Sequence, residues 1–422
     1  MALSDASMPC ALASATTAMG FLSLLTATME PVRELGVFAA LGILLNFGVN
    51  FTVGPALLCW LKVPPRPEQA NGMEHQLGKL SGFLGRHRFA ATGLSAVLVL
   101  GGALGISTIR VESDPLTFLD EELKAVQDYE LICSSLTGVY ALELLIDNPE
   151  GWRSPESLGA LEPIEHALHN LPGVAKVLGP GSGVEDERGL ARESMSRFIS
   201  SDGKTARLSV LINVMDSGRF SDILDVAEEA LRDLPAPLRG GATGIVPRLV
   251  RAQLDLVSTQ LLSFGLAFCI VFACILVGLR SFKLMLVSIL PNMVPIGAAF
   301  SAMAIADVPL DAGTVMVASV ALGIAVDDTV HLLAGFRRGL RGNGTPIEAC
   351  RHALAHAGPA MIITTATACA GFFALARSAF VPIQWFGLLS GLAMVAALAA
   401  DLLTVPALLM LLPWRRSVHD AS

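Results

Sequence analysis

The sequence predicts an α-helical polytopic membrane protein that carries one α/β domain. Of its 422 residues, 53% are hydrophobic and only 16% are charged, and the mean hydropathy is +0.61. A soluble protein of this length would be less apolar. Stretches of about 20 apolar residues are long enough to cross roughly 30 Å of hydrocarbon. Eight such stretches occur, near residues 8–28, 35–61, 89–108, 258–279, 284–305, 312–334, 359–378 and 384–412.

A long polar region, residues 109–255, separates the third and fourth stretches. It carries 25 Asp or Glu against 14 Lys or Arg and nets −11, whereas the rest of the chain nets +3. Loops rich in Lys and Arg face the cytoplasm, so we expect 63–87 and 336–357 to be cytoplasmic and 109–255 to lie outside. The basic residues that set this orientation are Lys62, Arg66, Lys79, Arg86, Arg88, Arg280, Lys283, Arg337, Arg338, Arg341, Arg351, Arg415 and Arg416.

Hydrophobic periodicity predicts that this polar region is an α/β domain. Alternation of apolar and polar residues indicates half-buried strands, and spacing of three to four indicates amphipathic helices. Two successive strand–helix–strand units of this kind are typical of a ferredoxin-like subdomain. The expected elements are a strand at 139–147, a helix at 155–171, the returning strand "GVAKVLG", a strand at 205–214, a helix at 219–233, and "LRGGATG" leading into a helix from 246.

An internal repeat relates the two ends of the chain. Aligning residues 11–61 with 362–412, at an offset of 351 without gaps, gives 13 identities in 51 positions. Apolar helices share Leu and Ala by chance. Four distinctive matches nevertheless fall in one register, and such repeats are common in transporters. They are "GF" at 20–21 and 371–372, Pro31 with Pro382, Gly36 with Gly387, and "PALL" at 55–58 and 406–409.

The same offset places the first-copy counterparts of the acidic helix and of the polar domain before Met1. We therefore expect the chain to hold the last two helices of a first repeat and a complete six-helix second repeat. The expected domains are 1–62 (two helices of the first repeat), 63–87 (cytoplasmic linker), 88–108 (first helix of the second repeat), 109–255 (α/β domain), 256–413 (the remaining five helices) and 414–422 (cytoplasmic tail).

The most informative motif is "GIAVDDTVHLL" (323–333), which puts two carboxylates and a histidine into an apolar run. An Asp at the centre of a membrane helix is disfavoured by about 2.5 to 3.5 kcal/mol, so the pair costs about 5 to 7 kcal/mol. On a helix His331 lies four residues from Asp327 and three from Asp328, so it can lie beside both. Paired buried carboxyls such as those of Asp327 and Asp328 can load and release a proton. His331 could either take part in that proton transfer or act only as a hydrogen-bond partner.

Other polar residues in the apolar stretches are candidate supporting groups. Asp401 is the only other acid deep in a stretch and aligns with Asn50 across the repeat. It is expected either to hold helices together through hydrogen bonds or to support the proton transfer. Thr364 and Thr365, with Thr367, could donate hydrogen bonds to the acids from the next helix. Thr is also common in membrane helices where it has no role beyond packing.

Enzymatic and nucleic-acid functions find little support in the sequence. Divalent metal sites need ligands that converge from several elements, and no other His or Cys has suitable spacing. An intramembrane aspartyl protease would place its two acids on different helices, as Asp327 and Asp401 are, but the expected Gly-x-Gly-Asp is absent. Phosphate-binding loops and nucleic-acid motifs are also missing. We therefore expect that the protein is not an enzyme and that it binds neither a metal ion nor a cofactor.

Three segments carry a resemblance to a known family: "GIAVDDTVHLLAGFRRGL", "PNMVPIGAAFSAMAIADVPLDAGTVMVASVALG" and "GFFALARSAFVPIQWFGLLSG". Together with the repeat, they resemble the RND superfamily, specifically its MMPL-type branch of bacterial exporters. The resemblance implies twelve spans in two six-helix repeats, each with a periplasmic porter domain, of which this sequence lacks most of the first. It also implies that acids at the positions of Asp327 and Asp328 couple transport to the proton-motive force.

The resemblance implies a proton-driven exporter of hydrophobic or amphipathic substrates such as lipids, in a bacterial inner membrane. A lipid-binding or sensing module that does not pump remains an alternative, as does an accessory subunit for protein export. The expected partners are membrane lipids, a lipid-like substrate, and either a subunit that supplies the missing half or a second copy of the chain. No nucleic-acid partner is expected.

Overall fold

A computed structural model describes residues 2–28, 30–61, 72–112, 116–120, 122–152, 154–180, 197–213, 217–311, 313–341 and 345–414. Residues 62–71, which include the start of the predicted linker, and residues 415–422, nearly all of the predicted tail, lie outside these ranges. The chain divides into two compact units. One comprises Met1–Ile109, Leu256–Ser378 and Pro382–Ser422, and the other comprises Arg110–Asp255 and Ala379–Val381.

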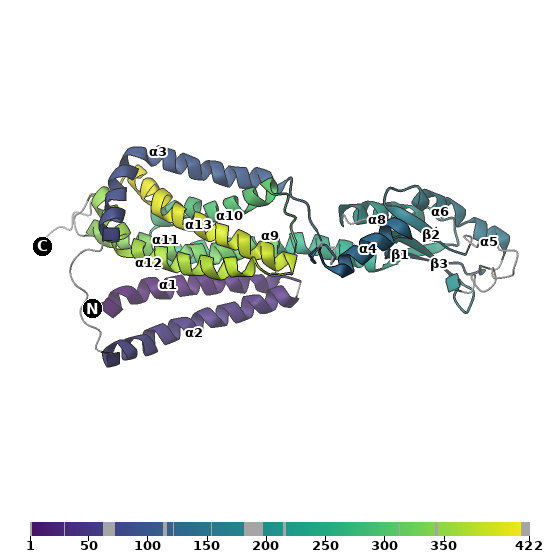
Figure 1. The fold of residues 1–422 in the computed structure, drawn as a ribbon, viewed down its shortest axis with the longest axis horizontal. Helices are drawn as coiled ribbons and strands as arrows, with labels where there is room; N and C mark the ends of the chain where they lie inside the picture. Colours follow the sequence, from purple (N-terminus) through teal and green to yellow (C-terminus); the bar gives the residue numbers. More distant parts are fainter. Residues whose placement is uncertain are drawn as a thin grey trace. The chain divides into compact units, whose positions relative to one another are not determined.

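The first unit is a bundle of long apolar helices (Figure 1). In the described part of the chain, eight helices are long and apolar enough to cross a membrane. This confirms the predicted fold class. The helices are α1 (Ala2–Leu22), α2 (Glu30–Leu61), α3 (Gly72–Ile106), α9 (Ile245–Leu279), α10 (Phe282–Ile305), α11 (Val317–Arg341), α12 (Pro346–Leu375) and α13 (Val381–Leu411).

Two segments expected to be loops, 63–87 and 336–357, are largely helical where the structure describes them, so the helices are longer than the apolar stretches. Helix α3 begins at Gly72 and bends at His87, so most of the expected 63–87 linker is helix. The expected loop at 336–357 is replaced by the end of α11 and the start of α12, which Thr345 and Glu348 cap reciprocally. The two polar helix ends pack closely, since a Cβ at Gly339 would lie 2.7 Å from Cα of Ala349.

The internal repeat has a structural counterpart in two close helix contacts. A Cβ at Gly36 would lie 2.6 Å from the carbonyl oxygen of Phe21, and a Cβ at Gly387 would lie 2.5 Å from that of Phe372. Both residues of the second contact are 351 positions from those of the first. Because only glycine permits such an approach, α1–α2 and α12–α13 are two copies of one helical hairpin.

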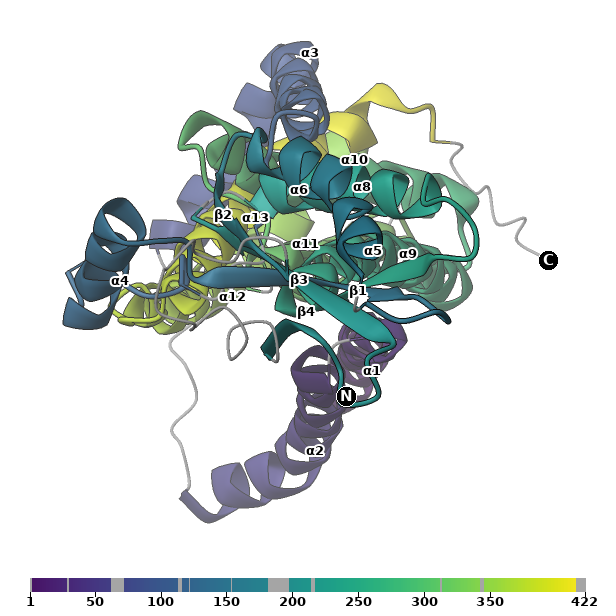
Figure 2. The ribbon, with the colours of Figure 1, turned by 90° about the vertical axis from the view of Figure 1, so that its right-hand side faces the viewer.

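The second unit is an α/β domain around a four-stranded antiparallel sheet of order β2-β3-β1-β4. Alternate residues of β1 (Tyr140–Asp147) are buried, as the sequence predicts, and helices α6 and α8 cover one face of the sheet (Figure 2). This topology is the expected ferredoxin-like one. The other elements are α4 (Lys124–Ser135), α5 (Pro155–Gly159), α6 (Glu162–His169), β2 (Val174–Leu178), β3 (Thr205–Ile212), α8 (Ser217–Arg232) and β4 (Arg239–Gly244).

Two details of this domain differ from the expectation. The helix predicted at 155–171 is broken into α5 and α6, because Pro163 occupies the first turn of α6 and starts a new helix there. Helix α4 was not predicted, since its polar sequence has only a weak apolar stripe formed by residues such as Val126 and Tyr129.

Candidate functional site

The acidic motif lies in the middle of α11, which is the most enclosed helix of the membrane unit. Helix α1 approaches α11 where Gly20 faces Gly323, and a Cβ on Gly20 would lie 3.1 Å from Cα of Gly323. Helix α12 approaches on another side, where Gly335 meets Ala353. These small residues bring α1 and α12 close to α11, and so determine what surrounds the acids.

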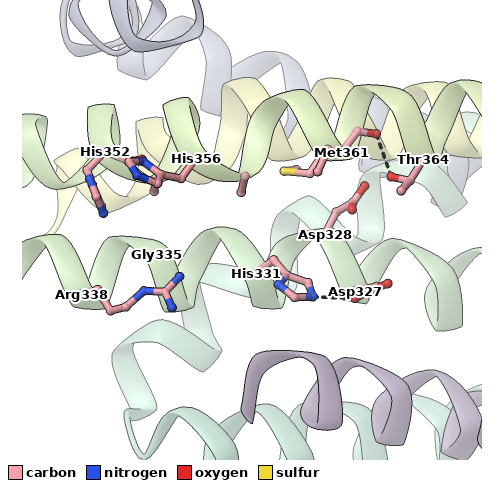
Figure 3. Close-up of a pocket in the computed structure, with 12 residues that line it drawn as sticks. Asp327, Asp328, His331, Gly335, Arg338, His352, His356, Met361 and Thr364 are labelled. Carbon is pink, nitrogen blue, oxygen red and sulfur yellow. Dashed lines mark hydrogen bonds and ion pairs between the residues drawn. The ribbon is translucent and has the colours of Figure 1, made fainter. Parts of the chain in front are cut away.

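Asp327 and His331 form an ion pair along one face of α11. Nε2 of His331 lies 3.3 Å from Oδ1 of Asp327, as expected for residues four apart on a helix (Figure 3). The Asp327 side chain is 51% exposed and that of His331 is 34% exposed. The pair therefore lies on an open face, although most of α11 is buried.

Asp328 points to a different neighbour. Its side chain is directed towards α12 (Figure 3), where the buried Thr365 is its hydrogen-bond partner. The adjacent acids thus occupy two environments: one on an open face beside a histidine, the other packed between two helices. His331 is near both acids but forms its ion pair with Asp327.

Asp401 belongs to a buried polar network behind α11. Its side chain is 1% exposed, and Oδ1 accepts a 2.6 Å hydrogen bond from the Thr329 hydroxyl. The Asn292 amide in turn donates to Thr329 at 3.2 Å and to the Ser288 carbonyl at 2.7 Å. The network therefore links α10, α11 and α13 one residue away from Asp328.

The three predicted threonines differ in whether they reach the acids. Thr365 contacts Asp328 directly. Thr364 lines the same cavity as the acids, but its hydroxyl donates to the Met361 carbonyl of its own helix. Thr367 is exposed and donates to the Ile363 carbonyl, so it does not reach the acids.

A cavity of about 280 Å³ lies between α11 and α12, beside the acids. Some of the residues that line it were not predicted from the sequence. His352 and His356, one turn apart on α12, line it together with Arg338 of α11 (Figure 3). The two imidazole rings have centroids 4.0 Å apart. In the sequence these histidines lie in an apparent loop, and only their spacing of four residues indicates a shared helix face. Within the described ranges, no group of three His, Cys, Asp or Glu has the arrangement of a metal site.

Comparison with known proteins identifies relatives of this chain. A membrane protein of Methanocaldococcus jannaschii is 24% identical over 282 residues, which is 61% of this chain and 72% of that protein. The hopanoid transporter HpnN of Rhodopseudomonas palustris is 26% identical over 172 residues, which is 40% of this chain and 18% of the transporter's length. The family described as MMPL matches residues 2–72 and 163–421. The protein is a multi-pass membrane protein that belongs to the MMPL family of transporters.

Proposed function

We propose that this protein exports a hydrophobic or amphipathic substrate, such as a lipid, and that proton movement through Asp327 and Asp328 drives the export. The observation that carries the proposal is the pair of adjacent carboxyls in two environments on α11, with a cavity beside them. Intramembrane acids are costly and are usually retained for function. The similarity to a hopanoid transporter supports a lipid-like substrate.

The cavity suggests a path for the proton. His331, His356 and His352 follow one another along the cavity, away from the acids and towards Arg338 (Figure 3). Histidine exchanges protons near neutral pH and serves as a shuttle. In this scheme a proton reaches the carboxyls from the solvent on one side and leaves past the histidines on the other.

We further propose that the outer surface of α2 is covered by another membrane unit of the same repeat. Phe38 is 68% exposed, whereas its repeat counterpart Leu389 is 3% exposed. Asn50 is exposed, whereas its counterpart Asp401 is buried. Helices α10 and α11 bury these positions in the second copy, so equivalents of α10 and α11 would bury them in the first.

Glycine contacts support the same partner. Gly20 packs on Gly323 of α11, but a Cβ at its counterpart Gly371 would meet no atom within 4 Å. The repeat therefore predicts that Gly371 faces a helix equivalent to α11, which would also lie near the open Asp327–His331 pair. Such a unit would complete the relay from the other side, consistent with the two-repeat organisation.

The proposed location is a bacterial inner membrane, with the arginine-rich end of α11 in the cytoplasm and the α/β domain outside it. The orientation follows from the distribution of Lys and Arg. In this arrangement the α/β domain would handle substrate on the outer side while the acids respond to the proton gradient.

The test compares Asp327→Asn and Asp328→Asn with Asp311→Asn as the matched control. Asp311 is also buried and acidic, but it caps the turn before α11 by accepting from the backbone amides of Gly313 and Thr314, a role that Asn can fill. Each variant is introduced at the native gene locus, so that natural partners are retained. Efflux of a labelled lipid from membrane vesicles is then followed under an imposed pH gradient.

We expect the Asp328→Asn and Asp327→Asn proteins to reach normal membrane levels and to lose gradient-dependent efflux, while Asp311→Asn retains it. One proton crossing 100 mV supplies about 2.3 kcal/mol, which corresponds to roughly a 50-fold concentration ratio. Wild-type efflux rates in both α11 variants would rule out the relay. Lipid binding without gradient-dependent efflux in the parent would instead favour a sensing module.

A further inference from the structure

A second cavity, of about 270 Å³, lies at the arginine-rich end of α11, where α1 and α9 meet it. One wall is apolar and is formed by Met8 and Leu12 of α1, Leu279 of α9 and Ala334 of α11. The helices are close here, because a Cβ at Gly278 would collide with the Leu12 side chain. Glycine at this position therefore lets α1 approach α9 and form the apolar wall.

The rim of this cavity is strongly basic. Arg337, Arg338 and Arg341 all line it, and none of the lining residues that the structure describes is acidic. The Arg337 side chain is half-buried, and its Nη1 donates a 2.6 Å hydrogen bond to the carbonyl of Leu279 at the end of α9. That bond uses one of five guanidinium N–H donors and holds the group at the mouth of the cavity.

A fourth arginine directly follows Leu279 of the cavity wall and has an unfavourable backbone conformation. Arg280 follows the last residue of α9 with φ of 46°, in the left-handed region. Glycine usually occupies this position after a helix, because a side chain there is disfavoured. Arg341 lies one turn beyond Arg337 on α11, and Arg280 directly follows Leu279, whose carbonyl accepts the Arg337 hydrogen bond. The fold thus brings like charges together and places one of them on a strained residue.

The general preference for basic residues at the cytoplasmic end of a helix explains the sign of these charges. It does not explain why they surround a cavity with an apolar wall, or why Arg occupies a left-handed position. A ligand with a phosphate beside acyl chains explains all three features. Its phosphate would neutralise the arginines, and its chains would cover Met8 and Leu12.

We propose that this cavity binds the headgroup phosphate of an anionic phospholipid. The phosphate accepts from the Arg337 and Arg341 guanidinium groups, with Arg280 adding charge, and the adjoining acyl chains lie against α1. Arginine suits this role because its planar guanidinium can donate two hydrogen bonds to one phosphate. The site does not require the proton relay, so either proposal can fail alone.

The test measures binding of phosphatidylglycerol to the full chain purified in detergent, by native mass spectrometry. Phosphatidylcholine with the same acyl chains is the reference ligand. The variants are Arg280→Gly, Arg341→Gln and, as a matched control, Arg86→Gln, since Arg86 is an exposed arginine of α3 that does not line the cavity. Arg280→Gly is the most informative, because it removes the charge and relieves the backbone at the same time.

We expect the parent to prefer phosphatidylglycerol, and Arg280→Gly and Arg341→Gln each to weaken its binding roughly fivefold, the equivalent of about 1 kcal/mol per basic residue. Arg280→Gly should melt at the same temperature as the parent or higher, which separates lost binding from lost folding. Equal binding of both lipids, or an equal loss in Arg86→Gln, would overturn the proposal. Displacement of the lipid by millimolar inorganic phosphate would assign the site to a soluble phosphate and also overturn it.

Discussion

Replacing Asp401 separates a structural role for the polar network behind α11 from a role in proton transfer. Asp401 is almost fully buried, and only its Oδ1 has a hydrogen-bond partner among the described residues. Asp401→Asn keeps an acceptor for the Thr329 hydroxyl and removes the titratable proton. It also introduces the residue that the first repeat carries at the equivalent position, Asn50. Asp401→Leu removes the acceptor as well.

The hydrogen bonds of Asp401 set the expected change in the free energy of unfolding for each variant. We expect Asp401 to be neutral and structural, so the Asn variant should change the free energy of unfolding by no more than about 1 kcal/mol. The Leu variant removes the 2.6 Å acceptor of the buried Thr329 hydroxyl and leaves it only the 3.5 Å contacts with the Ala325 carbonyl and Asn292 Oδ1. A fully unpaired buried group costs about 1 to 3 kcal/mol, so we expect a loss near the lower end of that range. An ionised Asp401 would behave differently, since removing an uncompensated buried charge would stabilise the Asn variant markedly.

Two measurements on the same variants decide between these roles. Thermal unfolding of the purified protein reports stability, and lipid efflux under an imposed pH gradient reports coupling. We expect the Asn variant to match the parent in both, and the Leu variant to unfold at a lower temperature. An Asn variant of unchanged stability that has lost gradient-dependent efflux would refute the structural role and make Asp401 a member of the relay.

Three further predictions concern other parts of the molecule. Removing the imidazoles that line the relay cavity, by His352→Gln with His356→Gln, should slow gradient-dependent efflux several-fold at unchanged protein level, and an unchanged rate would exclude them from the proton path. Burial, with the nearby charge of Glu162, raises the pKa of Glu165 in the α/β domain. This side chain therefore favours folding at low pH, and its contribution is lost as the pH rises through that raised pKa, so Glu165→Gln should raise the melting temperature near pH 7 and reduce its pH dependence. In intact cells carrying no other cysteine, a membrane-impermeant thiol reagent should label Cys133 of the α/β domain but not Arg341→Cys, and the reverse pattern would invert the proposed orientation.

The natural Cys350 cannot serve as the cytoplasmic position in that labelling experiment, because it is buried between helices. The sequence places it in an apparent polar loop, where it would be accessible. The contrast shows why the sequence misjudges this region. Polar residues such as Arg338 and His352 indicate contact with water, but they do not show that the helix ends there.

Local patterns in the sequence were enough to predict the helices and the pair on α11. The length of an apolar stretch predicts a span, and the four-residue spacing of Asp327 and His331 predicts their contact, which the structure places at 3.3 Å. The sheet order also follows from two strand–helix–strand units. Each of these inferences depends on residues that are close together in the sequence.

Contacts between distant helices could not be predicted in this way. Thr329 and Asp401 are 72 positions apart, and Asn292 is 37 positions from Thr329. No spacing rule connects such residues, because their contact depends on how α10, α11 and α13 pack. The same holds for His356. It lines the same cavity as Asp328 only because small residues bring α12 close to α11.

Arg338 connects the two proposed sites physically. It lines both the relay cavity, with His352 and His356, and the arginine-rich cavity, with Arg337 and Arg341. A lipid phosphate bound in the second cavity would therefore bring negative charge close to the mouth of the first. Because coupling between two ligands is reciprocal, loading the relay with protons should alter lipid binding by the same factor as lipid binding alters proton loading. Substituting Arg338 would disturb both sites together, so Arg280 and Arg341 are the positions at which lipid binding can be weakened while the relay cavity keeps all of its residues.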